Sequence, residues 1–580
     1  MVTLVFPSLR VIMWPLSASL LLLVLLDLHL LLFCSAGTAA SPPTVAPVSP
    51  TAACRTSVYP KLCRAVLAPL RFPASHYGFG RYSVKKALKQ ARRTSKILDN
   101  LLFPGGSARS RRIAGGAGAG SALEDCGELA RLNTEYLEEV AAELGRGEKA
   151  LSSLKAADRV RTLMSAVVTN QQTCFDGLEA AAASAASRRG TTPPPNAEML
   201  APFVNASQLY CVSLELVSSA LSPKGRVPGK PPGLNSTQHS QGFPTEGRHL
   251  AEVTQPRPLA GVRIRGAVVV AKDGSGDFTT ITEAVAFAPN NTDVEDGYFA
   301  ITVGEGVYEE NVVVDKHKKN LILLGAGINR TVVTGNRSFV DGSSTFKSAT
   351  FAVHGERFIA VNITFENTAG PEKHQAVAVR NSADLSAFYL CSFVGYQDTL
   401  YVHSLRQFYR DCDIYGTVDF IFGNAAAVFQ NCNIYARQPM ADQVNAVTAQ
   451  GRTHPNQTTG ISIHNCTVRA APDLAADPNA TQTYLGRPWK EFSRTVYMQS
   501  YLQELIQPAG WLEWNGSFAL STLYYGEFEN YGPGANTSGR VQWPAYRLMA
   551  GEEASNFTVY NFIGGDAWLP YAIPHSGGLL

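Results

Sequence analysis

The sequence lacks the patterns that would indicate a zinc-binding or nucleic-acid-binding protein. Nine of its ten cysteines follow residue 36, and none forms the CxxC pair typical of a structural zinc site. Aromatic residues are not interleaved with the basic ones, which disfavours nucleic-acid recognition. The leucine pattern of a leucine-rich solenoid is also absent. With 45% hydrophobic and 17% charged residues, the composition is that of a globular protein and excludes bulk disorder.

The N-terminus has the order of a secretory signal, which we assign to residues 1–36. Arg10 precedes a long apolar run, and small residues follow it in CSAGTAA. The run is long enough to span a bilayer, so an uncleaved signal anchor is the alternative. Asp27 and His29 inside the run disfavour that alternative. Twelve N-x-S/T sequons in the chain also fit a secreted glycoprotein.

Composition divides the rest of the chain into two regions joined by a linker. Residues 37–50 are rich in Pro, Thr, Ser and Ala and are expected to form a short linker. Residues 51–222 carry apolar residues at helical spacing, which predicts an antiparallel helical bundle. Within them, the Gly-rich segment 104–120 is predicted to be a loop. Residues 223–262 contain many Pro and Gly without periodicity and are predicted to link the bundle to residues 263–580.

Residues 263–580 change to short strand-like runs separated by Gly and Asn. The runs resemble one another, and cysteines mark the period. Cys391 and Cys412 are 21 residues apart, and Cys432 follows 20 residues later. Strand-rich repeats of this length predict a parallel β-helix.

Asp398 and Asp419 lie 21 residues apart among apolar and aromatic neighbours. If one coil has about 21 residues, the two carboxylates face each other on adjacent strands, which lie roughly 4.8 Å apart. Two such carboxylates push their pKa values apart, so that one stays ionised while the other keeps its proton. This favours a nucleophile beside a general acid. The alternative is a hydrogen-bonding ladder along the solenoid.

Five ordered motifs in residues 263–580 resemble those of pectin methylesterases. They are GVYEE (306–310), QAVAV (375–379), QDTL (397–400), DFIFG (419–423) and LGRPW (485–489). Val379, where the family often has Leu, is the one departure. The helical segment is similar to the inhibitor-like pro-region of plant pectinesterases through ACRTSVYPKLC (53–63), ALEDC (122–126) and TNQQTCFDGL (169–178). The resemblance implies a right-handed parallel β-helix preceded by a four-helix bundle.

The resemblance also implies an activity, the hydrolysis of methyl esters of cell-wall pectin to pectate and methanol. Asp419 matches the nucleophile and Asp398 the acid/base. Gln375 and Gln397 match the amides that stabilise the oxyanion, and Arg487 matches the residue that holds Asp419 ionised. The implied substrate-binding residues are Thr345, Gln375, Arg487 and Trp489. No metal or organic cofactor is implied. We expect His403 and His464 to be structural.

Disulfides are expected in both regions of a secreted chain. Position in the bundle predicts the bridges Cys54–Cys63 and Cys126–Cys174, with Cys211 free. In the β-helix, the resemblance implies a Cys432–Cys466 bridge.

The family's other bridge would join Cys391 to the preceding coil, where this chain has Thr364. Cys391 is therefore expected to be a buried free thiol, unless it bridges Cys412.

The two halves of the chain differ in charge. Residues 1–250 hold 27 Lys and Arg against 16 Asp and Glu, a net of +11, and residues 251–580 hold 23 against 31, a net of −8. With the basic cluster at 81–96, this difference favours the hypothesis that opposite charge holds the helical region on the enzyme until cleavage near GRHLAE (247–252). Without the helical region, the acidic β-helix has no electrostatic reason to adhere to polyanionic pectin. The alternative is a folding or retention segment that does not touch the site.

Other functions remain open at this stage. A pectate lyase or a polygalacturonase would share the solenoid and the substrate but would need a different catalytic set. A binding protein would use the helical region to inhibit other esterases and would leave the solenoid inactive. The expected partners are methylesterified pectin, the inhibitor-like region in cis, separate inhibitor proteins and a processing subtilase, with no nucleic acid.

Overall fold

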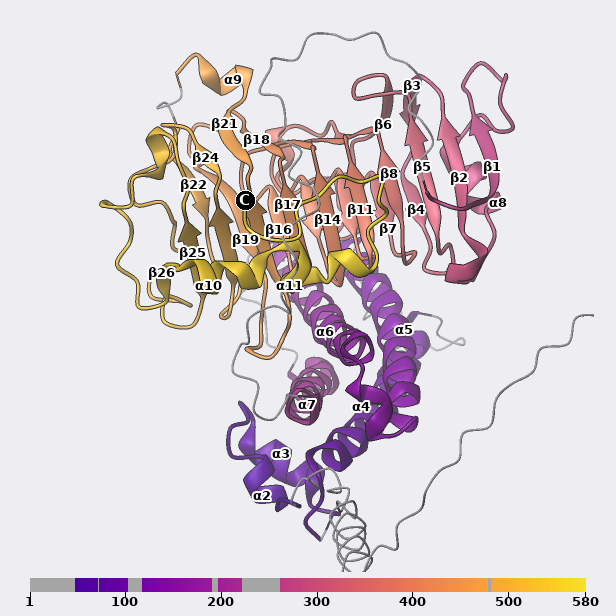
Figure 1. Ribbon diagram of the computed structural model, residues 1–580, viewed down its shortest axis with the longest axis vertical. Coiled ribbons are helices and arrows are strands. Elements are labelled where there is room, and N and C mark those ends of the chain that lie inside the picture. The colour runs from indigo at the N-terminus through magenta and orange to yellow at the C-terminus, as the bar shows by residue number, and fades with distance from the viewer. Residues whose placement is uncertain (1–46, 71, 103–116, 190–196, 222–260, 478–480) are drawn as a thin grey trace, which may run out of the picture. The chain divides into compact units, whose positions relative to one another are not determined.

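The computed structural model describes residues 47–70, 72–102, 117–189, 197–221, 261–477 and 481–580 (Figure 1). The predicted signal and the predicted processing site near 247–252 lie outside the described residues. Within the described ranges, no helix is both long enough and apolar enough to cross a membrane.

The N-terminal region is an all-helical bundle, as predicted. Its four long helices are α4 (His76–Leu102), α5 (Ala117–Gly145), α6 (Leu154–Arg189) and α7 (Ala197–Leu221), preceded by the short α2 (Pro50–Ala53) and α3 (Pro60–Leu67). α5 begins inside the segment predicted to be a loop. α4 shows why the bundle forms, because its buried residues recur at helical spacing along one face: Val84, Ala87, Ala91 and Leu98.

Two disulfides hold the bundle, and both were predicted. Cys54–Cys63 joins the end of α2 to α3, and Cys126–Cys174 links α5 to α6. Cys211 on α7 is a buried free thiol.

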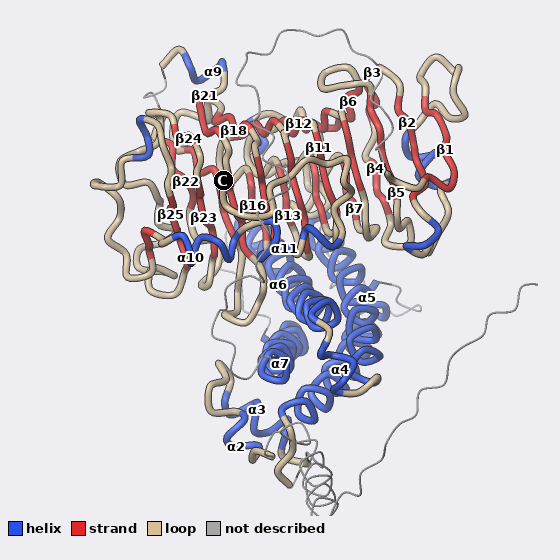
Figure 2. The backbone as a smooth tube through the Cα atoms, viewed as in Figure 1, coloured by secondary structure: helices blue, strands red, loops and turns tan. Residues whose placement is uncertain are grey.

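The C-terminal region is a parallel β-helix built from three sheets (Figure 2). The first sheet is, in spatial order, β1 (Ile264–Val270), β2 (Tyr298–Val303), β5 (Leu321–Gly325), β8 (Ile359–Val361), β11 (Ser386–Tyr389), β14 (Arg406–Arg410), β17 (Ala426–Gln430), β20 (Gly460–His464), β23 (Arg494–Met498), β25 (Tyr524–Phe528) and β26 (Tyr546–Leu548). The second is β22 (Thr483–Gly486), β19 (Asn445–Gln450), β16 (Ile421–Gly423), β13 (Leu400–Val402), β10 (Val379–Asn381), β7 (Phe351–Val353) and β4 (Val312–Val314). The third is β24 (Tyr501–Leu502), β21 (Thr467–Ala470), β18 (Asn433–Ala436), β15 (Asp413–Gly416), β12 (Ser392–Val394), β9 (Thr364–Asn367), β6 (Thr331–Gly335) and β3 (Gly306–Glu309).

The strand register confirms the period read from the cysteines. Leu400 of β13 pairs with Ile421 of β16, and Ser392 of β12 pairs with Asp413 of β15, each 21 residues on. Every coil therefore presents equivalent positions to the same face. Aromatic rings at equivalent positions stack inside the β-helix. The rings of Phe388, Tyr409 and Phe429, from three successive coils, have centroid distances of 5.3 and 4.5 Å.

Short helices close the β-helix at its ends and along one side. α8 (Ile281–Phe287) begins at Thr280, whose side chain accepts a hydrogen bond from the Glu283 amide. α9 (Pro472–Ala475) follows β21, and α10 (Gly551–Ala554) and α11 (Val559–Ile563) come after the last strand. Val559 and Ile563 of α11 pack in one apolar cluster with Phe408 and Val428 of the first sheet, so the C-terminal segment covers that sheet (Figure 1).

The cysteines of the β-helix stack at equivalent positions as buried free thiols. Cys391 and Cys412 are free, in agreement with the expectation for Cys391. Cys432 and Cys466 are also free, so the implied bridge between them is wrong for this structure. Their thiols point to main-chain carbonyls instead, since Cys432 Sγ donates to Tyr409 and Cys466 Sγ to Phe429.

Candidate active site

Asp398 and Asp419 occupy the turns that lead into β13 and β16, one coil apart. The register of these strands places the two positions side by side, and the Asp398 amide donates to the Val418 carbonyl at 3.0 Å. Both residues have left-handed backbone conformations, with φ of 64° and 53°. Such conformations are uncommon for residues other than glycine and cluster at functional sites. Asp398 and Asp419 are 7% and 5% exposed as whole residues, so both are buried.

Arg487 binds one of the two carboxylates with both ends of its guanidinium. It follows β22, and its Nε and Nη2 each donate to an oxygen of Asp419 at 2.7 Å. A bidentate pair of this kind fixes the orientation of the carboxylate and favours its ionised form. Arg487 therefore donates hydrogen bonds to Asp419 and none to Asp398.

The pKa values of both aspartates are raised, but by different amounts. Burial and then the negative charge of Asp419 raise the pKa of Asp398 well above its ordinary value, against a weaker opposing effect of Arg487. Burial also raises the pKa of Asp419, while the hydrogen bonds and charge of Arg487 lower it. Asp398 is thus the carboxyl that keeps its proton to higher pH, and Asp419 is the one that ionises first.

The two carboxyls lie in a cavity of about 280 Å³ together with Gln375 and Gln397. The Gln397 Oε1 atom is buried without a hydrogen-bond partner. In the described part of the chain, the side-chain amide of neither glutamine donates to a protein acceptor. These amides are therefore available to a ligand in the cavity. The described residues include no group of three or more His, Cys, Asp or Glu side chains suited to a metal ion.

Aromatic rings form the rest of the cavity wall. Trp489 and Phe422 line it, with ring centroids 6.0 Å apart at an edge-on angle. Trp514 lines it as well, and its ring lies 4.6 Å from the Arg487 guanidinium carbon. The sequence did not predict Trp514, which follows Trp511 by three residues just as Trp489 follows Gly486, the parallel-bridge partner of Trp511 on the preceding coil. Neither spacing nor any of the five motifs marks this residue.

Thr345 lies outside the cavity of the two aspartates, in a neighbouring one of about 570 Å³ that shares Phe422 and Trp489 with it. This second cavity is enclosed partly by the helical bundle. Its lining includes Ala122 and Asp125 of α5 and Thr173, Asp176, Gly177, Ala180 and Ala181 of α6. The cavity of the two aspartates is lined by residues of the β-helix region alone.

The sequence matches two family profiles that divide the chain as its fold does. The Pectinesterase profile covers residues 267–566, more than half of the chain. The plant invertase/pectin methylesterase inhibitor profile covers residues 49–216. The chain belongs to the pectinesterase family. We therefore refer to the β-helix as the pectinesterase region.

Relatives of known sequence and structure agree with this assignment. The chain is 51% identical over 563 residues to "Probable pectinesterase/pectinesterase inhibitor 25" of Arabidopsis thaliana, covering 92% of this chain and 87% of the relative. It is 52% identical over 562 residues, with the same coverage, to "Probable pectinesterase/pectinesterase inhibitor 47" of the same plant. The structure of pectin methylesterase from carrot is 54% identical and has a TM-score of 0.53, covering 54% of this chain and 98% of the carrot chain.

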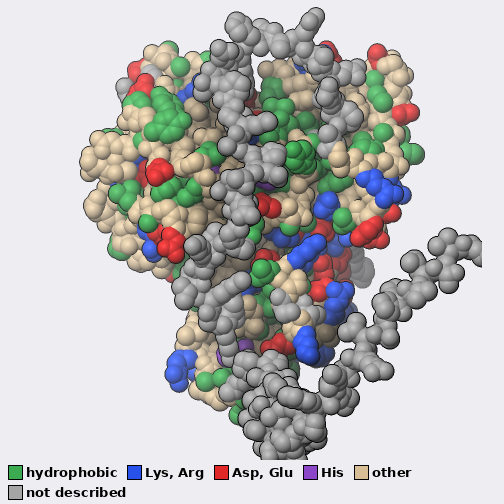
Figure 3. Space-filling model, in the orientation of Figure 1, with side chains coloured by type: hydrophobic (Ala, Val, Ile, Leu, Met, Phe, Trp, Pro, Cys, Tyr) green, Lys and Arg blue, Asp and Glu red, His purple; other side chains and the backbone are tan. Residues whose placement is uncertain are grey.

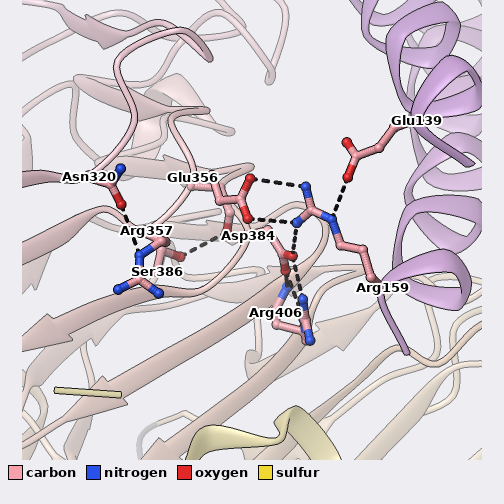
Figure 4. Close-up of polar contacts among 9 residues, drawn as sticks. Glu139, Arg159, Asn320, Glu356, Arg357, Asp384, Ser386 and Arg406 are labelled. Atoms are coloured by element: carbon pink, nitrogen blue, oxygen red, sulfur yellow. Dashed lines mark hydrogen bonds and ion pairs between the residues drawn. The ribbon is translucent and has the colours of Figure 1, made fainter. Parts of the chain in front are cut away.

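The helical region contacts the pectinesterase region through a network around Arg159 of α6 (Figure 4). The Arg159 guanidinium donates to Glu356 at 2.8 and 3.0 Å and to Asp384 at 2.7 Å. Arg406 donates to both oxygens of Asp384, at 3.0 Å to Oδ1 and at 2.7 Å to Oδ2, the oxygen that Arg159 also contacts. Burial would raise the pKa of Asp384, but Arg406 and Arg159 lower it to about 2. Asp384 therefore stays ionised in mildly acidic solution.

Histidine and lysine side chains of the pectinesterase region meet acidic residues of the bundle. Lys490, next to Trp489, pairs with Asp176 at 2.7 Å, and Lys347 pairs with Glu128 at 2.7 Å. His354 lies 3.2 Å from Glu128, and His454 lies 2.9 Å from Glu215. His403 lies between Ser382 and Thr173 of α6, at 3.0 Å from the hydroxyl of each.

This interface corrects the hypothesis based on net charge. Except for Arg159, the ion pairs between the regions place the acid on the helical side and the base on the pectinesterase side. Within the described residues, no ion pair joins the basic cluster 81–96 to the pectinesterase region. Net charge is a sum over the whole surface. The contact between the regions depends instead on the charges of the α5, α6 and α7 faces that meet the enzyme.

Proposed function

We propose that this pectinesterase hydrolyses the C6 methyl esters of homogalacturonan with Asp419 as nucleophile. Asp419 attacks the ester carbonyl and forms an acyl-enzyme, while Asp398 donates its proton to the departing methoxide, which leaves as methanol. Asp398 then takes a proton from water, and the resulting attack on the acyl-enzyme releases the carboxylate. The observation that supports these roles is the bidentate Arg487 pair on Asp419 alone.

The remaining cavity residues complete this mechanism. Gln375 and Gln397 donate amide hydrogens to the oxyanion of the tetrahedral intermediate, which suits side chains that donate without titrating. Trp489 presents a flat apolar face to a sugar ring, and Thr345 binds the polymer further along the cleft. Reaction at an extracellular site in the cell wall would follow from the predicted signal.

The catalytic assignment is tested by substituting each aspartate in the pectinesterase region, residues 251–580. We expect Asp419→Asn and Asp398→Asn each to lower kcat for methanol release from methylesterified pectin by roughly 10³-fold or more. Circular dichroism and thermal unfolding check that each variant is folded. A folded Asp419→Asn protein with near-normal turnover would exclude the mechanism.

We further propose that the helical region restrains the enzyme in cis by covering the part of the substrate cleft that contains Thr345. The support is that α5 and α6 line the cavity containing Thr345, and that Asp176 pairs with Lys490 beside Trp489. A polymer lying across both cavities would meet these helices. The catalytic cavity, lined by the pectinesterase region alone, would still admit a small ester.

Obstruction of this kind predicts a dependence on substrate size. With the helical region attached, the rate on methylesterified pectin should fall much further than the rate on the methyl ester of monomeric galacturonate. Equal inhibition of both substrates would show that the helical region acts on the catalytic groups rather than on the cleft. The rival function, inhibition of separate esterases by an inactive chain, predicts no methanol release from either substrate.

A further inference from the structure

The basic cluster at 81–96 lies on a helix face turned away from the rest of the bundle. At about 100° per residue, its seven Lys and Arg residues fall within an arc of roughly 140° on α4. The buried residues of α4, among them Val84, Ala87, Ala91 and Leu98, fall on the opposite side. We define the basic stripe as Arg81, Lys85, Lys86, Lys89, Arg92, Arg93 and Lys96, all of them exposed.

The basic stripe is almost free of neutralising charge. No Asp or Glu occurs between residues 28 and 98. Within the described residues, the one ion pair made by the stripe is Arg92–Glu138 at 2.8 Å, with side chains 61% and 47% exposed. Such an exposed pair is weak and is readily exchanged for another anion. Asp99 and Glu135 lie beside Arg92 and Lys96 in a shallow groove, but they pair with Arg131 and Lys316.

The length of the basic stripe favours a polymeric ligand over a small one. From Arg81 to Lys96 the helix rises about 22 Å, at about 1.5 Å per residue. Figure 3 shows Lys and Arg side chains on the outer surface of the helical region. A row of positive charges of this length, with long and rotatable side chains, is complementary to an extended polyanion.

The reaction of this family makes such a polyanion. Each ester hydrolysed leaves one carboxylate on the polymer, so successive turnovers produce a chain with a negative charge on every sugar. The pectinesterase region, with a net charge of −8 over residues 251–580, has little electrostatic attraction for this product. The basic stripe has the charge that this region lacks.

We infer that the basic stripe on α4 is a docking surface for demethylesterified pectin, the polyanionic product of the enzyme. Bound in this way, the uncleaved chain is held at de-esterified stretches of the polymer. Removal of the helical region would release an acidic enzyme from them. The inference takes the chemistry of the product from the family's reaction, but the binding itself requires no turnover.

Binding is measured with the full secreted chain carrying Asp419→Asn, so that the polymer is not altered during the experiment. The probe is polygalacturonate, with fully methylesterified pectin for comparison, over a salt series. The test variant is Lys85→Gln, Lys89→Gln, Arg93→Gln and Lys96→Gln combined, which leaves the Arg92–Glu138 pair in place and retains residues of good helix propensity. The matched control, Lys155→Gln, Arg265→Gln, Lys272→Gln and Arg547→Gln combined, removes the same charge from exposed positions elsewhere.

We expect the chain to bind polygalacturonate more tightly than esterified pectin, with an affinity that falls as salt rises. The test variant should lose about tenfold or more in affinity at low salt, and the control should lose much less. Thermal unfolding checks the fold, and Lys→Arg substitutions at 85, 89 and 96 should keep binding. If the test and control variants lost the same affinity for polygalacturonate, binding would depend on the net charge of the chain and not on the basic stripe, which would overturn the inference. Binding to phosphatidylserine vesicles but not to polygalacturonate would overturn it in favour of a membrane surface.

Discussion

At the scale of single residues, the site depends on one arginine that contacts two buried carboxyls unequally. Arg487 binds Asp419 through two hydrogen bonds and approaches Asp398 only as a more distant charge. Because both aspartates are buried, neither would ionise readily without a cation beside it. In the proposed mechanism, Arg487 therefore determines which aspartate is the nucleophile and which keeps the proton.

Replacing Arg487 should move the acid limb of the pH profile. Asp419 must be ionised to attack, and Arg487 lowers its pKa. In Arg487→Gln that pKa rises, so activity should be lost at a higher pH as the solution is acidified, by about one pH unit or more. The pH dependence of kcat/KM measures this shift.

Arg487→Lys is the matched control for this prediction, because it keeps the charge but not the paired hydrogen bonds. Its acid limb should lie between those of the parent and Arg487→Gln. An acid limb that stays in place in Arg487→Gln would mean that Asp419 is not the group whose ionisation starts the reaction.

At the scale of elements, the coil repeat explains how much of the site the sequence could predict. The 21-residue period by itself predicts that Asp398 lies beside Asp419, because equivalent positions of a β-helix lie side by side, and the strand register agrees. Trp514 was not predictable from this period, because its segment meets the preceding coil only at the isolated bridges Thr483–Ile506 and Gly486–Trp511, whose spacings differ from 21 residues. The free thiols of Cys432 and Cys466 show a similar limit, because stacking brings thiols together without deciding whether they are bonded.

The Arg159 network should contribute measurably to docking of the helical region. Arg159→Ala leaves Glu356 without its partner and Asp384 with Arg406 alone. Since the Arg159 side chain is only 22% exposed, we expect a loss of about 2 kcal/mol, or a roughly 30-fold weaker association between the two regions after the linker is cut. Calorimetric titration of one fragment with the other measures this.

Arg146→Ala is the control for that experiment, because Arg146 pairs with Glu143 inside the helical region and is 67% exposed. It should leave the association unchanged. If Arg159→Ala behaves like Arg146→Ala, the network is not a determinant of docking.

At the scale of the whole molecule, the chain joins an esterase to a helical region whose faces differ in charge. The faces of α5, α6 and α7 supply the acidic residues that meet the enzyme, while the outer face of α4 carries the basic stripe. The sequence predicted a bundle next to a β-helix, but net charge pointed to the wrong face of the bundle. Which helices meet the enzyme depends on tertiary packing, which composition does not encode.

The most direct test is the rate of methanol release from highly methylesterified pectin before and after the linker is cut. A protease site inserted at 247–252 allows one preparation to supply both states, with dilution to separate the regions after cutting. The account predicts a low rate from the uncut chain and a rate roughly tenfold or more higher after cleavage, with Asp419→Asn inactive in both states. Equal rates before and after cleavage would contradict restraint in cis, and the absence of methanol in both states would contradict the esterase mechanism itself.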